Sequence, residues 1–297
     1  MIGYRNEHTI AASCEVSGRG YWSGQDVCIR FHPAPISTGV VFVRTDLEGR
    51  PECPARSEFT DSVQFRTNLV RGAARFEMVE HLMAALAGLE IDNCLIETDA
   101  CEMPGLDGSC DAFVRCLQSA GLVIQAASKP RLVITEAIRV EADGAFVEAL
   151  PSPDGCLRFS YSLDYGQDSC IRPQSFEINC SPRSFVRQVA PARTFVTLDQ
   201  AEQLRASGVA RHVTNQELLV IGHDGVVDNE YRFRNECARH KTLDLIGDLS
   251  LAGLDLVGQF HSHRGGHRLN GMLASGLASL ANANHYKKTF QSTRKAA

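Results

Sequence analysis

Residues 78–98, MVEHLMAALAGLEIDNCLIET, carry the pattern that decides the fold. The stretch from Met78 to Ala87 is mostly apolar and predicts a short helix that ends at Gly88, because glycine commonly terminates a helix. After a turn-forming Asp-Asn pair, the run CLIETD predicts a buried strand. The helix also carries His81, so a core element and a candidate metal ligand coincide.

The same order of elements returns in the second half of the chain. Residues 232–252 predict a long helix that contains His240, residues 254–263 predict a strand, and residues 269–286 predict a last helix. In both halves a glycine-containing loop follows the strand. This internal similarity suggests duplication of one α+β unit.

Further strands precede the helices in each half. Apolar and alternating patterns predict strands in the segments 26–34, 39–47, 131–140, 145–150, 156–165 and 217–222, and a short helix over 198–208. The consecutive strands of the second half suggest a meander. Because strands come in runs and do not alternate strictly with helices, the pattern favours an α+β fold over a doubly wound parallel sheet.

A domain boundary is predicted near the middle of the chain. Residues 125–130, QAASKP, are small and polar, end in proline, and separate two segments that each begin with strands. A chain of 297 residues can form two ordinary domains. We therefore expect an N-terminal α+β domain over residues 1–126 and a C-terminal α+β domain over residues 127–297.

Composition and charge exclude several classes of protein. Hydrophobic residues make up 44% and charged residues 22%, the balance of a globular enzyme, and a net charge of −5 provides no basic footprint for nucleic acid. No apolar run is long enough to span a membrane, and the N-terminus lacks the apolar core of a secretory signal. Eleven cysteines without a C-x-x-C motif predict free thiols. We expect a cytoplasmic monomer.

Two clusters offer ligands for a metal ion. Glu80 and His81 are neighbours on the first helix, where they could present an imidazole to an ion and a carboxylate to its water. His240 and Asp244 are one turn apart on one face of the long helix. Either cluster alone is more often a surface or half-buried pair. Together, two imidazoles and one carboxylate form a catalytic zinc set with an open fourth position.

A third candidate is the loop histidine His267, which follows two glycines. Paired glycines let the backbone approach a ligand, and a histidine there could be a general acid. Asp248 lies one turn beyond Asp244 and could orient that imidazole through a hydrogen bond. A solvated loop histidine is an equally good interpretation of His267 alone.

Other motifs are weaker. His261 and His263 share one face of a strand but lack a third ligand at a recognisable spacing. The stretch Gly18-Arg19-Gly20 precedes a strand, whereas a dinucleotide loop follows one. Ser109 has no base nearby in the sequence and is better interpreted as a helix N-cap.

Several long stretches resemble the UDP-3-O-acyl-N-acetylglucosamine deacetylase family, the zinc enzymes of lipid A biosynthesis. They are GRGYWSGQDVCIRFHPAPISTGVVFVRTDL, VEHLMAALAGLEIDN, EMPGLDGS, ARTF, ARHKTLDLIGDLSLAG and GGHRLN. Together they extend over most of the chain. The resemblance implies two similar domains, each a mostly antiparallel sheet packed on helices, with the active site between them.

The resemblance also implies a role for each matched residue of the metal site. Zn²⁺ would be held by His81, His240 and Asp244. Glu80 would be the general base for the attacking water, and His267 would be the acid that faces the leaving amine. Asp248 would orient His267.

The remaining implied roles concern the substrate, UDP-3-O-acyl-N-acetylglucosamine. Thr194 would help to stabilise the oxyanion, Phe195 would pack near the sugar, and Lys241 would meet the nucleotide phosphates. Two departures from the family bear on lipid recognition: Trp22 stands where the family usually has histidine, and residues 209–216 replace a stretch normally rich in glycine and serine.

Two alternatives to the deacetylase stay open at this point. A divergent zinc amidase that acts on another N-acylated sugar would explain the altered segment 209–216, and a panel of substrates would separate the two enzymes. A catalytically silent protein that binds the nucleotide sugar would be expected to lack a ligand or the base, yet the sequence retains all of these residues.

Overall fold

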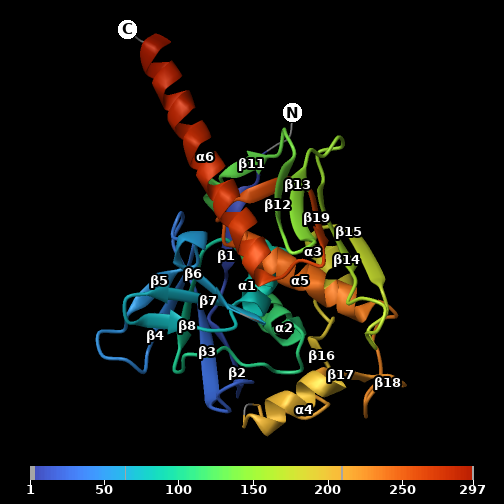
Figure 1. Cartoon of the computed structure of the whole chain (residues 1–297). Helices are drawn as coiled ribbons and strands as arrows, with labels where there is room; N and C mark the ends of the chain where they lie inside the picture. The colour runs from blue at the N-terminus through green and yellow to red at the C-terminus, as the bar shows by residue number, and fades with distance from the viewer. Residues whose placement is uncertain (1–3, 64, 209, 296–297) are drawn as a thin grey trace.

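The computed structural model describes residues 4–63, 65–208 and 210–295 and has the expected α+β architecture (Figure 1). The elements of the first half are β1 Asn6–Ile10, β2 Cys14–Arg19, β3 Asp26–Pro33, β4 Val40–Arg44, β5 Glu52–Pro54, the 3-10 helix η1 Ser57–Phe59, β6 Thr60–Val63, β7 Arg66–Arg71, β8 Ala74–Phe76, α1 Glu80–Gly88, β9 Cys94–Thr98, α2 Asp111–Ala120 and β10 Leu122–Ser128.

The second half repeats this order with different additions. Its elements are β11 Arg131–Val133, β12 Ile138–Ala142, β13 Ala145–Leu150, β14 Leu157–Leu163, β15 Gln174–Asn179, α3 Pro182–Gln188, β16 Phe195–Thr197, α4 Leu198–Ala206, β17 Leu219–Gly222, β18 Gly225–Val226, α5 Glu236–Ser250, β19 Asp255–His263 and α6 His267–Lys295. Among the residues described, no helix is both long and apolar enough to cross a membrane.

The main sheets of the two halves have the same topology. The first has the order β2-β3-β9-β4-β5 and the second the order β12-β13-β19-β14-β15, with β11 as an additional partner of β19. In each sheet the strand that follows the long helix inserts between two hairpins, antiparallel to one neighbour and parallel to the other. The duplication suggested by the sequence is therefore visible in the strand order.

Each half also carries a small three-stranded sheet in the same place, between the last hairpin and the helix. The first half inserts β6-β7-β8, and the second inserts β16-β17-β18 together with α4. The sequence predicted only the α4 helix and the β17 strand of these additions. Their short strands give weak periodicity, which explains why the others escaped prediction.

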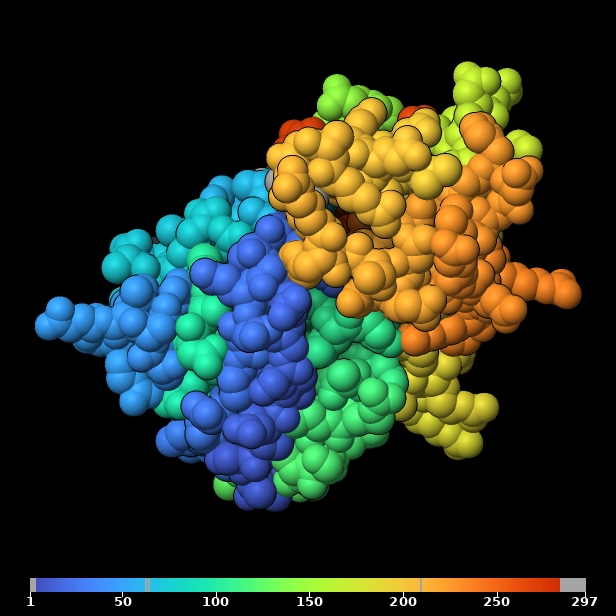
Figure 2. Space-filling model, turned by 90° about the horizontal axis from the view of Figure 1, so that it is seen from below, coloured from blue at the N-terminus to red at the C-terminus, as the bar shows by residue number. Residues whose placement is uncertain are grey.

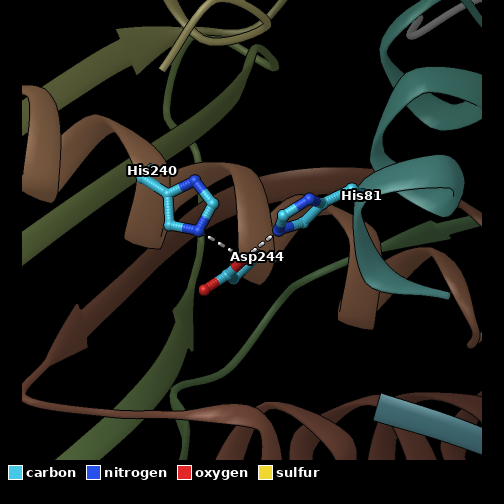
Figure 3. A group of neighbouring side chains, drawn as sticks. All are labelled: His81, His240 and Asp244. Atoms are coloured by element: carbon cyan, nitrogen blue, oxygen red, sulfur yellow. Dashed lines mark ion pairs between the residues drawn. The ribbon is translucent and has the colours of Figure 1, made fainter. Parts of the chain in front are cut away.

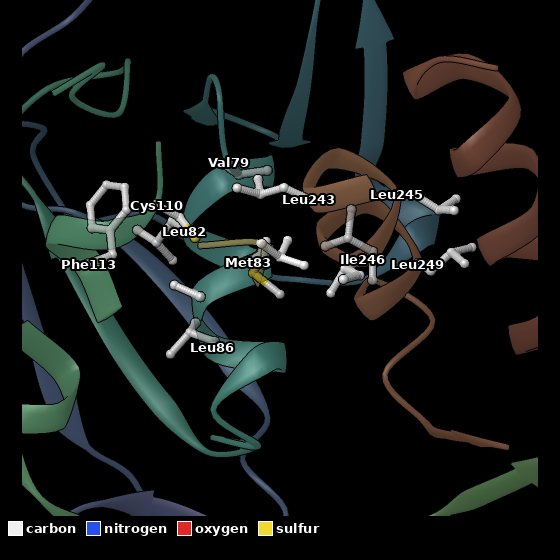
Figure 4. Close-up of a cluster of buried hydrophobic side chains, with 14 of the residues drawn as sticks. Val79, Leu82, Met83, Leu86, Cys110, Phe113, Leu243, Leu245, Ile246 and Leu249 are labelled. Carbon is white, nitrogen blue, oxygen red and sulfur yellow. The ribbon is translucent and has the colours of Figure 1, made fainter. Parts of the chain in front are cut away.

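Helices α1 and α5 cross at the centre of the molecule and join the halves. Apolar side chains from both helices and from α2 form a shared core (Figure 4): Val79, Leu82, Met83, Leu86, Cys110, Phe113, Leu243, Leu245, Ile246 and Leu249. At the crossing, a Cβ added to Gly247 would lie 2.1 Å from the carbonyl oxygen of Glu80. Glycine at position 247 thus permits the close backbone approach of the two helices.

Three expectations from the sequence need correction. Residues 125–128 of the predicted linker belong to β10, which pairs antiparallel with β1, because small polar residues also fit an exposed ribbon. The second sheet is not a simple meander, since β19 separates β13 from β14. The N-cap of α2 is Cys110, although the hydroxyl of Ser109 does accept a hydrogen bond from the backbone of Asp111.

Candidate active site

The first turn of α1 and one face of α5 bring the candidate residues together. Glu80 and His81 occupy the first turn of α1, directly after the β8 strand and a turn in which Met78 has a φ of 60°. His240, Asp244 and Asp248 follow at four-residue spacing along α5, which puts them on one face of that helix. All five side chains are buried. The two clusters predicted separately therefore meet at one place.

His81, His240 and Asp244 form the one group in the described part of the chain that could hold a metal ion (Figure 3). Their ligand atoms lie within 4.8 Å of one another. Nε2 of His81 is 3.6 Å and Nε2 of His240 is 3.4 Å from Oδ1 of Asp244. Among the residues described, that buried oxygen has no hydrogen-bond partner. A buried carboxylate oxygen facing two imidazoles is a donor set that fits a divalent cation.

The environment of His240 prepares it as a ligand. Its Nδ1 lies 3.1 Å from the carbonyl oxygen of Ala192, which favours the tautomer that presents Nε2 to the group. Burial lowers the pKa of His240 to about 3, so the ring is neutral. The supporting loop is fixed by a buried ion pair, in which Nε of Arg193 lies 2.8 Å from Oε1 of Glu236.

Lys241 balances the charge of Asp244. Its Nζ donates a 2.6 Å hydrogen bond to Oδ2 of Asp244. Burial opposes ionisation of both groups, but the attraction to the charge of Lys241 holds the pKa of Asp244 well below its usual range. The same attraction, again against burial, raises the pKa of Lys241. Asp244 is therefore an anion at neutral pH, as a metal ligand must be.

Glu80 lies beside this group with one oxygen fixed. The backbone N–H of Thr67, on β7, donates a 2.9 Å hydrogen bond to Oε2 of Glu80. Burial raises the pKa of Glu80, which makes the carboxylate a better proton acceptor than an exposed one.

His267 is the first residue of α6 and lies close to the same group. Its Nδ1 is 2.9 Å from Oδ2 of Asp248, and its Nε2 is 3.9 Å from Oδ2 of Asp244. Burial opposes protonation, but the charge and hydrogen bond of Asp248 outweigh it and raise the pKa of His267 to about 9. The imidazole is therefore protonated at neutral pH. The contact predicted between His267 and Asp248 is present.

Several residues that support the site were missed by the sequence analysis. The hydroxyl of Thr67 donates a 2.7 Å hydrogen bond to Oδ1 of Asp248, so Thr67 connects the surroundings of Glu80 and His267. Asn270 donates to Asp248 from α6. Of the buried pair Arg193–Glu236, Arg193 belonged to a matched stretch but Glu236 did not, and the two residues are 43 positions apart. Polar residues without a local motif offer no signal of such distant contacts.

A cavity of about 1080 Å³ opens onto these side chains. Thr194, Phe195 and Lys241 line it, as do Glu80 and His267. The ring of Phe195 lies 6.1 Å from that of His240, and the backbone of Thr194 is held by the carbonyl oxygen of Gly108. The cavity thus reaches from ionisable groups at its centre to apolar residues of the inserted segments.

His261 and His263 do not belong to this site. Both rings lie 5.5 Å from that of Phe146, and Nδ1 of His261 is 2.8 Å from the hydroxyl of Ser160. Among the residues described, neither histidine takes part in a group that could bind a metal. The weak metal pair suggested by their spacing is not supported.

The cavity brings together two imidazoles and one carboxylate that could hold a metal ion, and beside them lie a buried carboxylate and a protonated imidazole. This combination is typical of metal-dependent hydrolases. The pattern of the LpxC family, described as UDP-3-O-acyl N-acetylglycosamine deacetylase, matches residues 7–279. The chain belongs to this family.

Curated relatives agree over nearly the whole chain. The chain is 38% identical to the UDP-3-O-acyl-N-acetylglucosamine deacetylase of Thermosynechococcus vestitus, over 92% of this chain and 94% of the relative. It is 39% identical to the enzyme of the same name from Trichormus variabilis, over 93% and 99% of the two chains. For Psychrobacter cryohalolentis the identity is 37%, over 92% and 86%. These relatives do not favour the alternative of an amidase for another sugar.

Proposed function

We propose that the protein is a zinc-dependent deacetylase of lipid A biosynthesis. It would remove the N-acetyl group from UDP-3-O-(3-hydroxyacyl)-N-acetylglucosamine and release acetate. The observation that carries this proposal is the meeting of His81, from one half, with His240 and Asp244, from the other, between Glu80 and His267. The names of the relatives supply the substrate.

The metal ligands would be His81, His240 and Asp244. Two imidazole nitrogens and one carboxylate oxygen suit zinc and leave a coordination position open. When bound, zinc lowers the pKa of a water molecule and polarises the amide carbonyl. The unpartnered Oδ1 of Asp244 supports this assignment, because a cation would satisfy it.

Glu80 would be the general base. Its Oε2 is engaged by the N–H of Thr67, which leaves Oε1 to accept a proton from the water that attacks the acetyl carbon. Thr194, which lines the cavity, would donate to the developing oxyanion.

His267 would be the general acid. Because Asp248 binds Nδ1, the Nε2 proton is the one available to the substrate. Transfer of that proton to the amide nitrogen accompanies cleavage of the C–N bond, so the products are acetate and the free amine of the sugar. A protonated imidazole is needed because an amine anion is a poor leaving group.

The rest of the cavity would bind the remainder of the substrate. Phe195 would pack against the sugar, and Lys241 would provide positive charge for the phosphates. Apolar residues of the inserted segments would accept the acyl chain. We further propose a cytoplasmic monomer with domains over residues 1–126 and 127–297.

Metal analysis combined with a deacetylation assay tests the proposal. We expect one zinc per chain, release of acetate from UDP-3-O-acyl-N-acetylglucosamine, loss of activity with a chelator and recovery on adding Zn²⁺. Full activity of metal-free protein would contradict the metal assignment. Hydrolysis of a simpler N-acetyl sugar without turnover of the UDP-linked substrate would contradict the substrate assignment.

A further inference from the structure

The turn that carries Trp22 is in direct contact with the segment after α4, so the two departures from the family lie side by side. Trp22 lies in the turn between β2 and β3, and residues 210–216 follow α4. In Figure 2 the yellow to orange surface of the second half lies against the blue surface of the first half. Nε2 of His212 lies 2.8 Å from the carbonyl oxygen of Gly20. A Cβ added to Gly24, where φ is 69°, would lie 2.9 Å from Nδ1 of His212. The imidazole therefore fits closely against the glycine-containing turn.

The turn that carries Trp22 is also held by hydrogen bonds to Glu102 and Glu217. The backbone N–H groups of Trp22 and Ser23 each donate a 2.8 Å hydrogen bond to the carboxylate of Glu102, which is buried. The hydroxyl of Tyr21 donates to the carbonyl oxygen of Glu217, beyond the His212 segment. These contacts hold the turn against both halves of the molecule.

The side chains of Phe65 and Arg66 also pack against the indole ring of Trp22. The ring of Phe65 stacks on it at a centroid distance of 6.3 Å and an angle of 22°. The guanidinium of Arg66 lies 4.9 Å from its centroid, and Arg66 is itself paired with Glu77 at 3.0 Å. Stacking and cation–π contacts of this kind restrict the orientation of the ring.

This aromatic pair faces the cavity from the first half. Trp22 and Phe65 both line it, and 48% of Phe65 is exposed. Val213 and Leu218, from the second half, also line the cavity. The apolar part of the cavity is thus enclosed by walls from both halves.

We propose that Trp22 is a specificity-determining residue that limits the length of the acyl chain. This inference rests on the proposed deacetylase function. Glu102 fixes the backbone of the turn, and Phe65 and Arg66 pack against the indole, so extra methylenes would be forced against a packed wall, which is unfavourable. The contact between His212 and Gly20 keeps the opposite wall in place.

The test compares Trp22→Ala with the wild-type zinc enzyme on a series of UDP-3-O-acyl-N-acetylglucosamines with acyl chains of increasing length. We expect the variant to prefer longer chains, with kcat/KM rising about fourfold for each methylene that it newly accommodates. The change should lie mainly in KM, because the groups around the metal are untouched. Tyr4→Ala, an exposed aromatic outside the cavity, should keep the wild-type profile.

His212→Ala should shift the preference in the same direction but less, since it loosens one wall and leaves the indole in place. His223→Ala, in the exposed turn between β17 and β18, is the matched control. An unchanged profile of chain length in Trp22→Ala would overturn the inference while deacetylation itself stands.

A binding measurement separates the two proposals further. Trp22 is the only tryptophan of the chain, so its fluorescence reports on this position alone. In Glu80→Gln protein, where turnover is suppressed, we expect acylated UDP-N-acetylglucosamine to shift the emission to shorter wavelength and unacylated UDP-N-acetylglucosamine to leave it unchanged. Binding of the acylated compound without any change in emission would overturn the role of Trp22. Absence of binding would overturn both proposals.

Discussion

The two halves of the molecule share one strand order but contribute unequally to the site. In each half a helix leads to the central strand of the sheet, and a loop then leads to a second helix. In the second half that loop ends at His267, beside the ionisable groups. In the first half the corresponding loop contains Asp107, which pairs with Arg232 at 2.8 Å, and Gly108, which holds the backbone of Thr194.

This difference shows how the two copies of a duplicated unit can contribute different parts of one site. One loop supplies an imidazole to the site, and the other braces the segment that carries Thr194 and Phe195. Likewise, α1 contributes its first turn, whereas α5 contributes one face along its length. Neither half holds a complete set of ligands, so the site depends on the contact between them.

The largest effect is expected when a ligand is removed from either half. His81→Ala and His240→Ala should each lose zinc and lower kcat/KM by roughly 10⁴-fold, because the Lewis acid contributes several kcal/mol to the transition state. Metal content and activity should fall together in both variants. If either variant binds zinc as tightly as the wild type, the ligand set that spans the two halves is misassigned.

Glu80→Gln separates catalysis from metal binding within the first half. We expect zinc to remain stoichiometric while kcat falls by about 10³-fold, since an amide cannot accept the proton. Elemental analysis and steady-state kinetics check both quantities. Loss of zinc in this variant would mean that Glu80 supports the metal site itself.

Much of this comparison could be predicted from the sequence. Helix α1, helix α5 and their following strands were recognisable because apolar periodicity and glycine stops are local signals. The pairing of His240 with Asp244 followed from helical spacing. That His81 reaches them depends on the close helix crossing at Gly247, which no local pattern reveals. The contacts of Thr67 were hidden for the same reason, since its partner Asp248 is 181 residues away.

One additional methyl group at position 247 should disrupt the packing of α1 against α5. In Gly247→Ala the new Cβ would meet the backbone of Glu80, so α1 and α5 must separate. We expect unfolding free energy to fall by about 3 kcal/mol and activity by about 10²-fold, because small displacements of catalytic groups are costly. Denaturant unfolding and kinetics measure these changes.

Gly276→Ala is the matched control for the helix crossing. This glycine lies in α6, and a Cβ there would have nothing within 4 Å. Because alanine favours helix formation, we expect a gain of about 0.5–1 kcal/mol and unchanged kinetics. Equal stability of Gly247→Ala and wild type would refute the close approach.

Asp248→Asn tests the proposed role of His267 as the general acid. Asp248 raises the pKa of His267 against the effect of burial, and the proposed role requires the protonated imidazole. Removing the charge lowers that pKa, so the basic limb of the kcat profile should move to lower pH, with a loss of about tenfold at neutral pH. A basic limb that stays in place would show that His267 is not the group that titrates there.

Thr67→Val should give the smallest effect, and it separates the contribution of the Thr67 hydroxyl from that of the Asp248 charge. Valine removes the hydroxyl bonded to Asp248 but keeps the backbone N–H that binds Glu80 and the charge that acts on His267. We expect kcat to fall by about fivefold, consistent with one lost hydrogen bond of about 1 kcal/mol, while the basic limb moves much less than in Asp248→Asn. Kinetics across the pH range check both values. A shift as large as that of Asp248→Asn would mean that the hydroxyl, and not the carboxylate charge, controls the imidazole.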